Sequence, residues 1–347
     1  MAQTVAVCSL CLIVAFVSVS LCYSQGSTKH LKDIVLGRCW DFQRQKAHDV
    51  STKNCSKIWE TFYTAFAYKD PCNTTFADYA SYFDEIGMDI VKPNKSLFWS
   101  GTYKEAHLFS DFDVRFTTLE DTMAGWIVNG LTWCGTKTNT SDGINYSSCP
   151  KQTTSCDYST PFWGQASKRF AENASGIVRV MVNGTRMGSE HPIPAYRRDS
   201  FFGRYELPNF HVDRITRLII LVVHNIDGPD LESCGNGSIK LLQKDACDRG
   251  INTTCHDDPD DVRHLLCADQ PRSRECWFFN GGTKKVTQPT EDDNRSWKLV
   301  AIIMLGIVAA FCLMAAVIGV VCVKTRRGKC IDSFNYRKHA TDIEHET

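Results

Sequence analysis

LIILVV, at residues 218–223, is an uninterrupted run of six apolar side chains. A strand with one face in water alternates apolar and polar residues, whereas a central strand of a parallel sheet is buried on both faces and reads as a continuous apolar run. A second run, IVRVMV at residues 177–182, is rich in β-branched side chains, which favour strands. The sequence therefore predicts a small parallel sheet in the second half of the chain.

The first half of the chain has helical spacing instead. After Ser56, apolar side chains recur three and four residues apart, at Ile58-Trp59, Phe62 and Ala65-Phe66. We therefore expect an α+β ectodomain, residues 25–278, that has two lobes with a cleft between them. The helical lobe is expected mainly in residues 25–92 and 122–165, and the α/β lobe mainly in residues 93–121 and 166–278.

The composition limits the class of protein. The 347 residues include 39 basic and 39 acidic side chains, so the chain lacks the basic excess that is typical of nucleic-acid binding. A chain that is 43% hydrophobic and 22% charged has the composition of a globular protein and not of a disordered one. Its 17 cysteines are too many for an ordinary reduced cytosolic enzyme and indicate an oxidising compartment.

Two apolar segments predict the topology. Residues 4–22 precede small and polar residues around Ser24, which favours a cleaved signal peptide, residues 1–24; an uncleaved anchor is the alternative. Residues 299–323 carry no charge, and a helix of that length is about 37 Å long, enough to cross a bilayer. Four basic residues follow within residues 324–329, and positive charge stays on the cytoplasmic side.

These segments describe a single-pass type I membrane protein. Residues 279–298 are polar and read as a stalk, and residues 324–347 are expected to form a cytoplasmic tail. The ectodomain faces the outside of the cell in a plasma membrane or the lumen in a vesicle membrane, and both locations remain open. Ten N-x-Ser/Thr sequons predict a glycosylated surface, at Asn54, Asn73, Asn94, Asn139, Asn145, Asn173, Asn183, Asn236, Asn252 and Asn294.

Standard catalytic motifs are missing from the sequence. It contains no P-loop, HExxH, GxSxG or GxGxxG pattern, and its ten histidines lack the spacing of metal ligands. The sequence therefore supports neither a metalloenzyme nor a serine hydrolase, and we expect no metal site and no cofactor.

Four short segments instead combine tryptophans, carboxylates and small residues. They are SLFWSG at 96–101, TTLEDT at 117–122, PFWG at 161–164 and SFFGRYELPN at 200–209. In these segments the chain resembles the ADP-ribosyl cyclase/NAD glycohydrolase family, from about Leu36 to Cys276. The family's motifs match in order and spacing at residues 98–100, 118–122 and 202–206, and so do ten of the eleven ectodomain cysteines.

The resemblance implies a disulfide pairing that sequence alone cannot give. The implied pairs are Cys39–Cys55, Cys72–Cys156, Cys134–Cys149, Cys234–Cys255 and Cys267–Cys276. Cys247 is left over and is expected to be free or to pair with another molecule. The sixth pair of the mammalian family member is absent, because its two positions correspond to Pro93 and Ser175.

The family cleaves the bond between nicotinamide and ribose in NAD, so the resemblance implies an enzyme with NAD as its substrate. Nicotinamide leaves as a neutral ring and the ribose carbon gains oxocarbenium character, which requires a nearby anion. Glu206 matches the catalytic glutamate that contacts the ribose hydroxyls, and preorganised charge of this kind is worth about a thousandfold or more in rate. Without the resemblance, the alternative is a solvated glutamate on a loop.

Glu120 matches the glutamate that contacts the nicotinamide carboxamide and biases the choice of product. It also has a local structural interpretation, because Thr117-x-x-Glu120 is a capping-box pattern that opens a helix. The two roles are compatible, since the first turn of a helix can face a cleft. Asp121 is the weaker candidate, and a capping role alone would explain it.

The resemblance also identifies residues that would hold the substrate. Trp99 and Trp163 match tryptophans that line the family's pocket, where a pyridinium over an indole face gains about 0.5 to 2 kcal/mol. Core packing is their alternative role, and it is the role that we expect for Trp133. Positions that hold the diphosphate, by side chain or backbone amide, match Ser100, Gly101, Ser167 and Phe202.

Two further positions bear on the product. Phe201 corresponds to Phe in the cyclising molluscan enzyme and to Thr in the hydrolytic mammalian one, and Asn129 likewise resembles the molluscan residue. The resemblance therefore implies mainly cyclic ADP-ribose, in the setting of calcium signalling, with some ADP-ribose. Base exchange on NADP that rises at acidic pH and a homodimer are further expectations, and no nucleic-acid partner is expected.

Three alternatives remain open. The protein could be mainly an NAD glycohydrolase. It could instead be a surface receptor or adhesion protein that retains the fold, which would explain the membrane anchor. A glycosidase acting on glycans would also use two carboxylates and stacking tryptophans. Release of nicotinamide from NAD favours an NAD enzyme, whereas release of sugar from glycans without it favours the glycosidase.

Overall fold

The computed structural model describes residues 26–45, 52–87, 91–111, 113–138, 142–153, 155–188, 191–279 and 281. The chain divides into two units. The first contains every described helix and strand up to Ser273, and the second contains α10 (Arg274–Phe279). The predicted signal peptide, most of the stalk, the transmembrane helix and the tail lie outside the described residues. Within the described ranges, no helix has both the length and the apolar character to cross a membrane.

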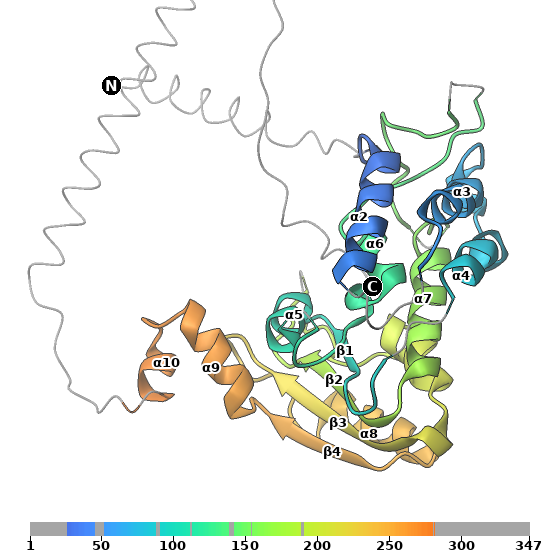
Figure 1. Ribbon diagram of the computed structural model, residues 1–347. Helices are drawn as coiled ribbons and strands as arrows, with labels where there is room; N and C mark the ends of the chain where they lie inside the picture. Colours follow the sequence, from blue (N-terminus) through green and yellow to red (C-terminus); the bar gives the residue numbers. More distant parts are fainter. Residues whose placement is uncertain are drawn as a thin grey trace, which may run out of the picture. The chain divides into compact units, whose positions relative to one another are not determined.

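The first unit contains a four-stranded parallel sheet (Figure 1). Its strands lie in chain order and are β1 (Leu97–Ser100), β2 (Gly176–Asn183), β3 (Ile215–Val223) and β4 (Thr253–Asp257). In the register of the sheet, Val180 pairs with Phe98 on one side and with Ile220 on the other. The predicted parallel sheet is therefore confirmed, with its two predicted runs in β2 and β3.

Both faces of β3 are buried, which explains why its sequence does not alternate. Leu218, Ile220 and Val222 belong to the main apolar core. Leu221 and Val223 belong to a second, smaller cluster on the opposite face. The helices α5 (Tyr103–Ser110) and α9 (Asp260–Asp269) contribute four side chains to this smaller cluster, namely Ala106, Phe109, Val262 and Leu266.

The remaining helices of the first unit share the main core with the sheet. They are α2 (Leu31–Gln45), α3 (Cys55–Phe66), α4 (Ala80–Ile86), α6 (Met123–Val128), α7 (Thr160–Asn173) and α8 (Gly237–Asp248). Phe62 on α3 packs against Phe162 on α7, and Phe98 on β1 packs against Phe170, also on α7. Trp133 is buried in this core, as predicted. These contacts make the helical part and the sheet a single packed body.

Disulfides reinforce this body. The described residues contain the bonds Cys39–Cys55, Cys72–Cys156, Cys134–Cys149 and Cys234–Cys255. These are pairs that the family resemblance implies. Cys267 and Cys276 are also disulfide-bonded. Cys247 is an exposed free thiol on α8, in agreement with its place outside the family pattern.

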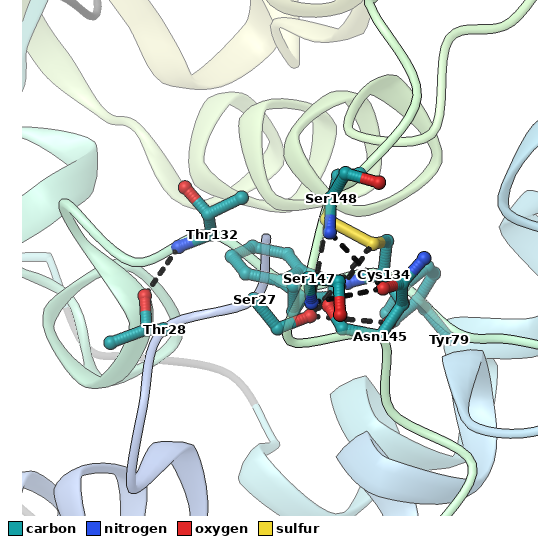
Figure 2. Close-up of a disulfide and its surroundings, with 10 residues drawn as sticks. Ser27, Thr28, Tyr79, Thr132, Cys134, Asn145, Ser147 and Ser148 are labelled. Carbon is teal, nitrogen blue, oxygen red and sulfur yellow. Dashed lines mark hydrogen bonds between the residues drawn. A yellow bond between two sulfur atoms is a disulfide. The ribbon is translucent and has the colours of Figure 1, made fainter. Parts of the chain in front are cut away.

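The segment that precedes α2 is held beside the Cys134–Cys149 disulfide (Figure 2). The Ser27 hydroxyl accepts a hydrogen bond from the Cys134 N–H at 2.9 Å and donates one to the Cys134 carbonyl oxygen at 3.2 Å. The backbone N–H of Ser27 donates to the Asn145 carbonyl oxygen at 2.8 Å. These bonds fix the segment before α2 against the loop that the disulfide closes.

Candidate active site

Most of the predicted site residues lie on four elements that pack together. They are Trp99 and Ser100 at the end of β1, Glu120 in a 3₁₀ turn (Leu119–Asp121), Trp163 and Ser167 on α7, and Glu206 at the end of a π-helical turn (Phe202–Glu206). α7 packs against both turns, and β1 packs against the π-helical turn. The fold therefore assembles one site from segments that are far apart in the sequence.

Glu206 is a buried carboxyl group. The residue is 6% exposed, and Ser167 on α7 forms a hydrogen bond with its side chain. Its Oε2 atom has no hydrogen-bond partner among the described residues. Burial raises the pKa of Glu206 to about 8; the charge of Glu120 adds to this rise and the Ser167 bond opposes it. The alternative of a solvated glutamate on a loop is therefore wrong.

The π-helical turn that carries Glu206 is fixed from its N-terminal side. The Ser200 hydroxyl accepts a hydrogen bond from the Gly203 N–H at 3.2 Å, and the Ser200 carbonyl oxygen accepts one from the Arg204 N–H at 2.8 Å. Gly203 packs directly on backbone, because a Cβ there would lie 2.2 Å from the Arg197 carbonyl oxygen. Single π-helical turns occur frequently at functional sites.

Gly203→Ala is expected to lower activity without unfolding the protein. The added methyl group must push the turn away from Arg197, and a displacement of about 1 Å can cost about a hundredfold in rate. We expect a loss of at least about tenfold in NAD turnover and of about 1 to 3 kcal/mol in stability. Gly37→Ala on α2 is the matched control, because nothing lies within 4 Å of the new methyl group. Unchanged turnover in Gly203→Ala would contradict this account of the turn.

Glu120 points toward Trp99 and is not part of a capping box. The indole N–H of Trp99 donates a hydrogen bond to Glu120 Oε2 at 3.2 Å. The capping box lies one residue later than predicted, because Asp121 Oδ2 accepts from both the N–H and the hydroxyl of Thr118, each at 2.8 Å. The predicted Thr117–Glu120 box is therefore wrong, since the Thr117 hydroxyl donates to Asp113 instead.

This shift separates the roles of the two acids. Asp121 is buried and its carboxylate is used as a cap, which agrees with its standing as the weaker candidate. The Glu120 carboxylate takes no part in capping and interacts with groups outside the turn. The turn packs closely against α6. A Cβ at Gly125 on α6 would lie only 2.3 Å from the Leu119 carbonyl oxygen. Glu120 is thus placed by backbone packing.

Trp99 and Trp163 differ from the core tryptophan Trp133. Both are only partly buried, whereas Trp133 is 4% exposed. The indole of Trp133 donates to the Tyr79 hydroxyl at 2.9 Å within the core. Trp163 packs edge-on against Phe162, with ring centroids 5.1 Å apart. Both partly exposed indoles therefore keep surface that a ligand could contact.

The four residues predicted to hold a diphosphate lie on or next to three elements, which are β1, α7 and the π-helical turn. Ser100 ends β1 and Gly101 follows it, and the Gly101 carbonyl oxygen accepts a hydrogen bond from Asn183 Nδ2 at 3.0 Å. Ser167 is buried and bonds to Glu206. The Phe202 side chain is fully buried, so the predicted contact, by side chain or backbone amide, stays a prediction for its backbone amide.

Sequence analysis did not single out Arg186, which lies beside Gly101. Its Nη1 would lie 3.4 Å from a Cβ built at Gly101. Gly101 has a positive φ of 69°, a conformation that favours glycine. The guanidinium therefore approaches the backbone of the Ser100-Gly101 segment, where a positive charge suits an anion. A single arginine in a loop carries no sequence signal that could have identified it.

Phe201 and Asn129 lie at different edges of the site. Phe201 is partly exposed and packs against Tyr205, with centroids 5.5 Å apart. Asn129 follows α6, and its Nδ2 donates to the Tyr103 hydroxyl at 3.1 Å. The Tyr103 ring in turn meets Trp99 edge-on, with centroids 5.4 Å apart. Asn129 is thus linked to Trp99 through Tyr103.

Sequence analysis also did not identify His107, whose Nε2 lies 3.4 Å from Glu120 Oε2. It lies on α5, which begins shortly after Trp99. The available signal was the spacing of Tyr103 and His107, which places both side chains on one face of a helix. Metal-ligand spacing among the histidines was the wrong criterion for finding this residue.

Comparison with known proteins gives the family. A family model described as ADP-ribosyl cyclase matches residues 28–276. The ADP-ribosyl cyclase/cyclic ADP-ribose hydrolase of Aplysia californica is 36% identical over 280 residues, which cover 80% of this chain and 96% of that protein. ADP-ribosyl cyclase/cyclic ADP-ribose hydrolase 1 of Oryctolagus cuniculus is 38% identical over 255 residues, covering 73% of this chain and 83% of that protein.

A solved structure agrees with these matches in both sequence and fold. The crystal structure of Aplysia cyclase complexed with substrate NGD and product cGDPR has a TM-score of 0.66 at 37% identity. The match covers 72% of this chain and 98% of that chain. The resemblance found in the tryptophan and glutamate segments is confirmed, and the chain belongs to the ADP-ribosyl cyclase family.

Proposed function

We propose that this protein is an enzyme that cleaves the nicotinamide–ribose bond of NAD and forms cyclic ADP-ribose with some ADP-ribose. The curated relatives are named ADP-ribosyl cyclase/cyclic ADP-ribose hydrolase, and a solved relative holds a substrate and a cyclic product. The observation that carries the proposal is the buried Glu206, whose Oε2 is unpartnered among the described residues and whose pKa is raised in part by Glu120. A site of this kind suits a substrate that brings a positive charge.

Glu206 is proposed to stabilise the ribose cation. As the bond to nicotinamide breaks, the ribose carbon gains positive charge, and this charge favours the ionised form of a nearby carboxyl. The Ser167 bond also favours the carboxylate over the neutral acid. A fixed anion at this point lowers the barrier, because its interaction strengthens as charge develops. This step requires neither a metal nor a cofactor.

Glu120, Trp99 and Trp163 are proposed to hold the leaving ring. Trp99 fixes Glu120 by its indole hydrogen bond, so the carboxylate can accept from a carboxamide N–H. The partly exposed indoles offer flat faces for the cationic pyridinium ring of the substrate. The helices and the sheet would then form the two lobes, with the active-site cleft between them. Ser100, Gly101, Ser167 and the Phe202 amide remain the proposed diphosphate contacts.

Product choice is proposed to depend on Phe201 and Asn129. An adenine nitrogen and water compete for the same intermediate, and a bulky apolar ring near it excludes water. Phe201 is partly exposed beside the turn that carries Glu206. This arrangement supports cyclisation as the main reaction.

The test is product analysis with the full-length protein and NAD. Cyclic ADP-ribose is expected as the major product, and Phe201→Thr is expected to shift the ratio of cyclic to linear product toward ADP-ribose by about tenfold, or about 1.4 kcal/mol in relative barriers. Phe116→Leu, in the smaller apolar cluster, is the matched control. ADP-ribose alone from the wild type would leave an NAD glycohydrolase and overturn cyclisation. No nicotinamide release at all would favour the receptor alternative.

We also propose a type I membrane topology with a signal peptide and a glycosylated ectodomain, at the plasma membrane or in a vesicle membrane. The apolar segments at residues 4–22 and 299–323 support the topology. Among the described sequons, several lie on exposed asparagines, namely Asn54, Asn73, Asn94, Asn236 and Asn252. Asn183 is a poor acceptor, because its side-chain amide donates to Gly101. Calcium signalling by the product, exchange on NADP and a homodimer complete the proposal.

A further inference from the structure

His107 joins Glu120 to α5 through two well-placed nitrogen atoms. Its side chain is 12% exposed, and Nδ1 lies 2.7 Å from the Tyr103 carbonyl oxygen one turn earlier on the same helix. Nε2 lies 3.4 Å from Glu120 Oε2, the oxygen that also accepts from Trp99. The Tyr103 ring covers the imidazole, with centroids 4.0 Å apart. The imidazole is therefore held in one orientation.

The hydrogen-bond partners of His107 determine its protonation state beside Glu120. A carbonyl oxygen only accepts, so Nδ1 of His107 carries a hydrogen. Nε2 faces Glu120 Oε2 and, at 3.5 Å, the hydroxyl oxygen of Thr118, whose own hydrogen goes to Asp121. Nε2 therefore faces acceptors and must carry a hydrogen when Glu120 is ionised. His107 is then an imidazolium, and the pair has no net charge.

The surroundings favour this protonated form. Burial lowers the pKa of His107, but the hydrogen bond and charge of Glu120 outweigh it, with smaller help from Tyr103 and Asp121, so the pKa lies above its ordinary value. From β1, the uncharged side chain of Trp99 contacts the His107 ring. Three charged groups of α9, which packs against α5, are engaged elsewhere, in the pairs Asp269–Lys104, Asp261–Arg115 and Arg263–Asp258.

We propose that His107 is a positioning residue for Glu120 whose positive charge decides which ring substituent the site accepts. A neutral His107–Glu120 pair accepts either the neutral carboxamide of nicotinamide or the anionic carboxylate of nicotinic acid. Without the imidazolium, the Glu120 carboxylate repels the acid and tolerates the amide. Within the described part of the chain, His107 is the one cationic side chain within 4 Å of Glu120. The inference rests on the proposed function and extends it to the exchange base.

The exchange reaction makes this difference measurable. The ring nitrogen of nicotinamide leaves with the electron pair of its bond to the ribose carbon. The ring nitrogen of nicotinic acid then donates its lone pair to form the new bond, so no oxidant or reductant is required. The ratio of nicotinic acid incorporation to total nicotinamide release reports the acceptance of the anion, because both rates start from the same intermediate.

The experiment compares four full-length proteins, the wild type and three variants, with NADP and nicotinic acid, from about pH 6 to about pH 9. For the wild type, the exchange ratio is expected to fall by at least about tenfold as the imidazolium loses its proton. In His107→Gln, which is neutral throughout, the ratio is expected to be low and flat. In His107→Lys, which stays charged, it is expected to be high and flat. His211→Gln is the matched control, because His211 is exposed and lies outside the site.

The outcomes separate this inference from the proposed function. A wild-type pH profile in His107→Gln or in His107→Lys overturns the role of His107, while nicotinamide release from NADP leaves the enzyme assignment intact. A wild type that releases no nicotinamide from NAD or NADP overturns the proposed function itself. If His107→Gln fails to fold, His107→Lys alone decides the test. A merely structural role of His107 would leave the exchange ratio dependent on pH in that variant, whereas the proposed role predicts a ratio that does not change with pH.

Discussion

Glu206→Gln is expected to lower NAD turnover by about a thousandfold or more and to leave the fold intact. Glutamine has nearly the same shape and can keep the hydrogen bond to Ser167, but it offers no negative charge to the ribose cation. The measurement is the rate of nicotinamide release per folded molecule. Glu60→Gln is the control, because Glu60 is exposed and lies on α3, which carries none of the predicted site residues. Turnover near the wild-type rate would remove Glu206 from the mechanism.

The same substitution is expected to stabilise the protein at neutral and mildly alkaline pH. Burial raises the pKa of Glu206 from its ordinary value of 4.5 to about 8, so the folded state holds this proton more tightly than the unfolded state. The folded protein therefore loses stability as the pH rises from 4.5 toward 8, by about 1.4 kcal/mol per pH unit. Glutamine does not ionise and avoids this loss.

Melting temperatures measured against pH check this second effect. The margin by which Glu206→Gln exceeds the wild type is expected to widen from pH 5 to pH 8. A variant that melts below the wild type at pH 8 would contradict the argument from burial. Higher stability with lower activity is the signature of a site in which an unfavourable charge is kept for catalysis.

Removal of the Cys72–Cys156 disulfide is expected to cause the largest loss of stability among the described disulfides. It joins residues 84 apart in sequence, and the loop-closure entropy of such a link is worth about 4 to 5 kcal/mol. We expect Cys72→Ala/Cys156→Ala to melt at least about 10 °C below the wild type. The double substitution leaves no unpaired thiol behind, so disulfide exchange does not complicate the measurement.

Cys39→Ala/Cys55→Ala provides the matched comparison. This disulfide joins residues 16 apart, which corresponds to about 3 kcal/mol in the same model. Melting temperatures of the two double variants, measured on equal amounts of purified protein, should therefore differ by several degrees. Equal losses would mean that strain or local packing, and not loop length, determines the contribution of these links.

The sequence was sufficient for features that depend on burial or on spacing. The run at residues 218–223 predicts a parallel strand because both faces of that strand must be apolar, and the structure places these residues in β3 between two apolar clusters. The cysteines and the Trp and Glu motifs identified the family because their order and spacing match the family pattern. Trp133 was correctly separated from the tryptophans of the site.

Other features depend on contacts that no local pattern records. The pattern for a capping box fits both Thr117–Glu120 and Thr118–Asp121, and the structure uses the second. A π-helical turn has no sequence period of its own over five residues, so the surroundings of Glu206 could not be predicted. The contact between His107 and Glu120 depends on how α5 packs, which the sequence near either residue does not state.

The register of the sheet has a consequence for the order of events in folding. β1 pairs with β2 across the long connection that separates Phe98 from Val180, whereas the helices of the first half form from neighbouring residues. Contacts between distant segments close late, because the entropy of loop closure must be offset before they give any stabilisation. The proposed site residues come from β1, from this connection and from the π-helical turn after β2. Catalytic activity should therefore be the last property that the refolding chain acquires, after its helical signal has recovered.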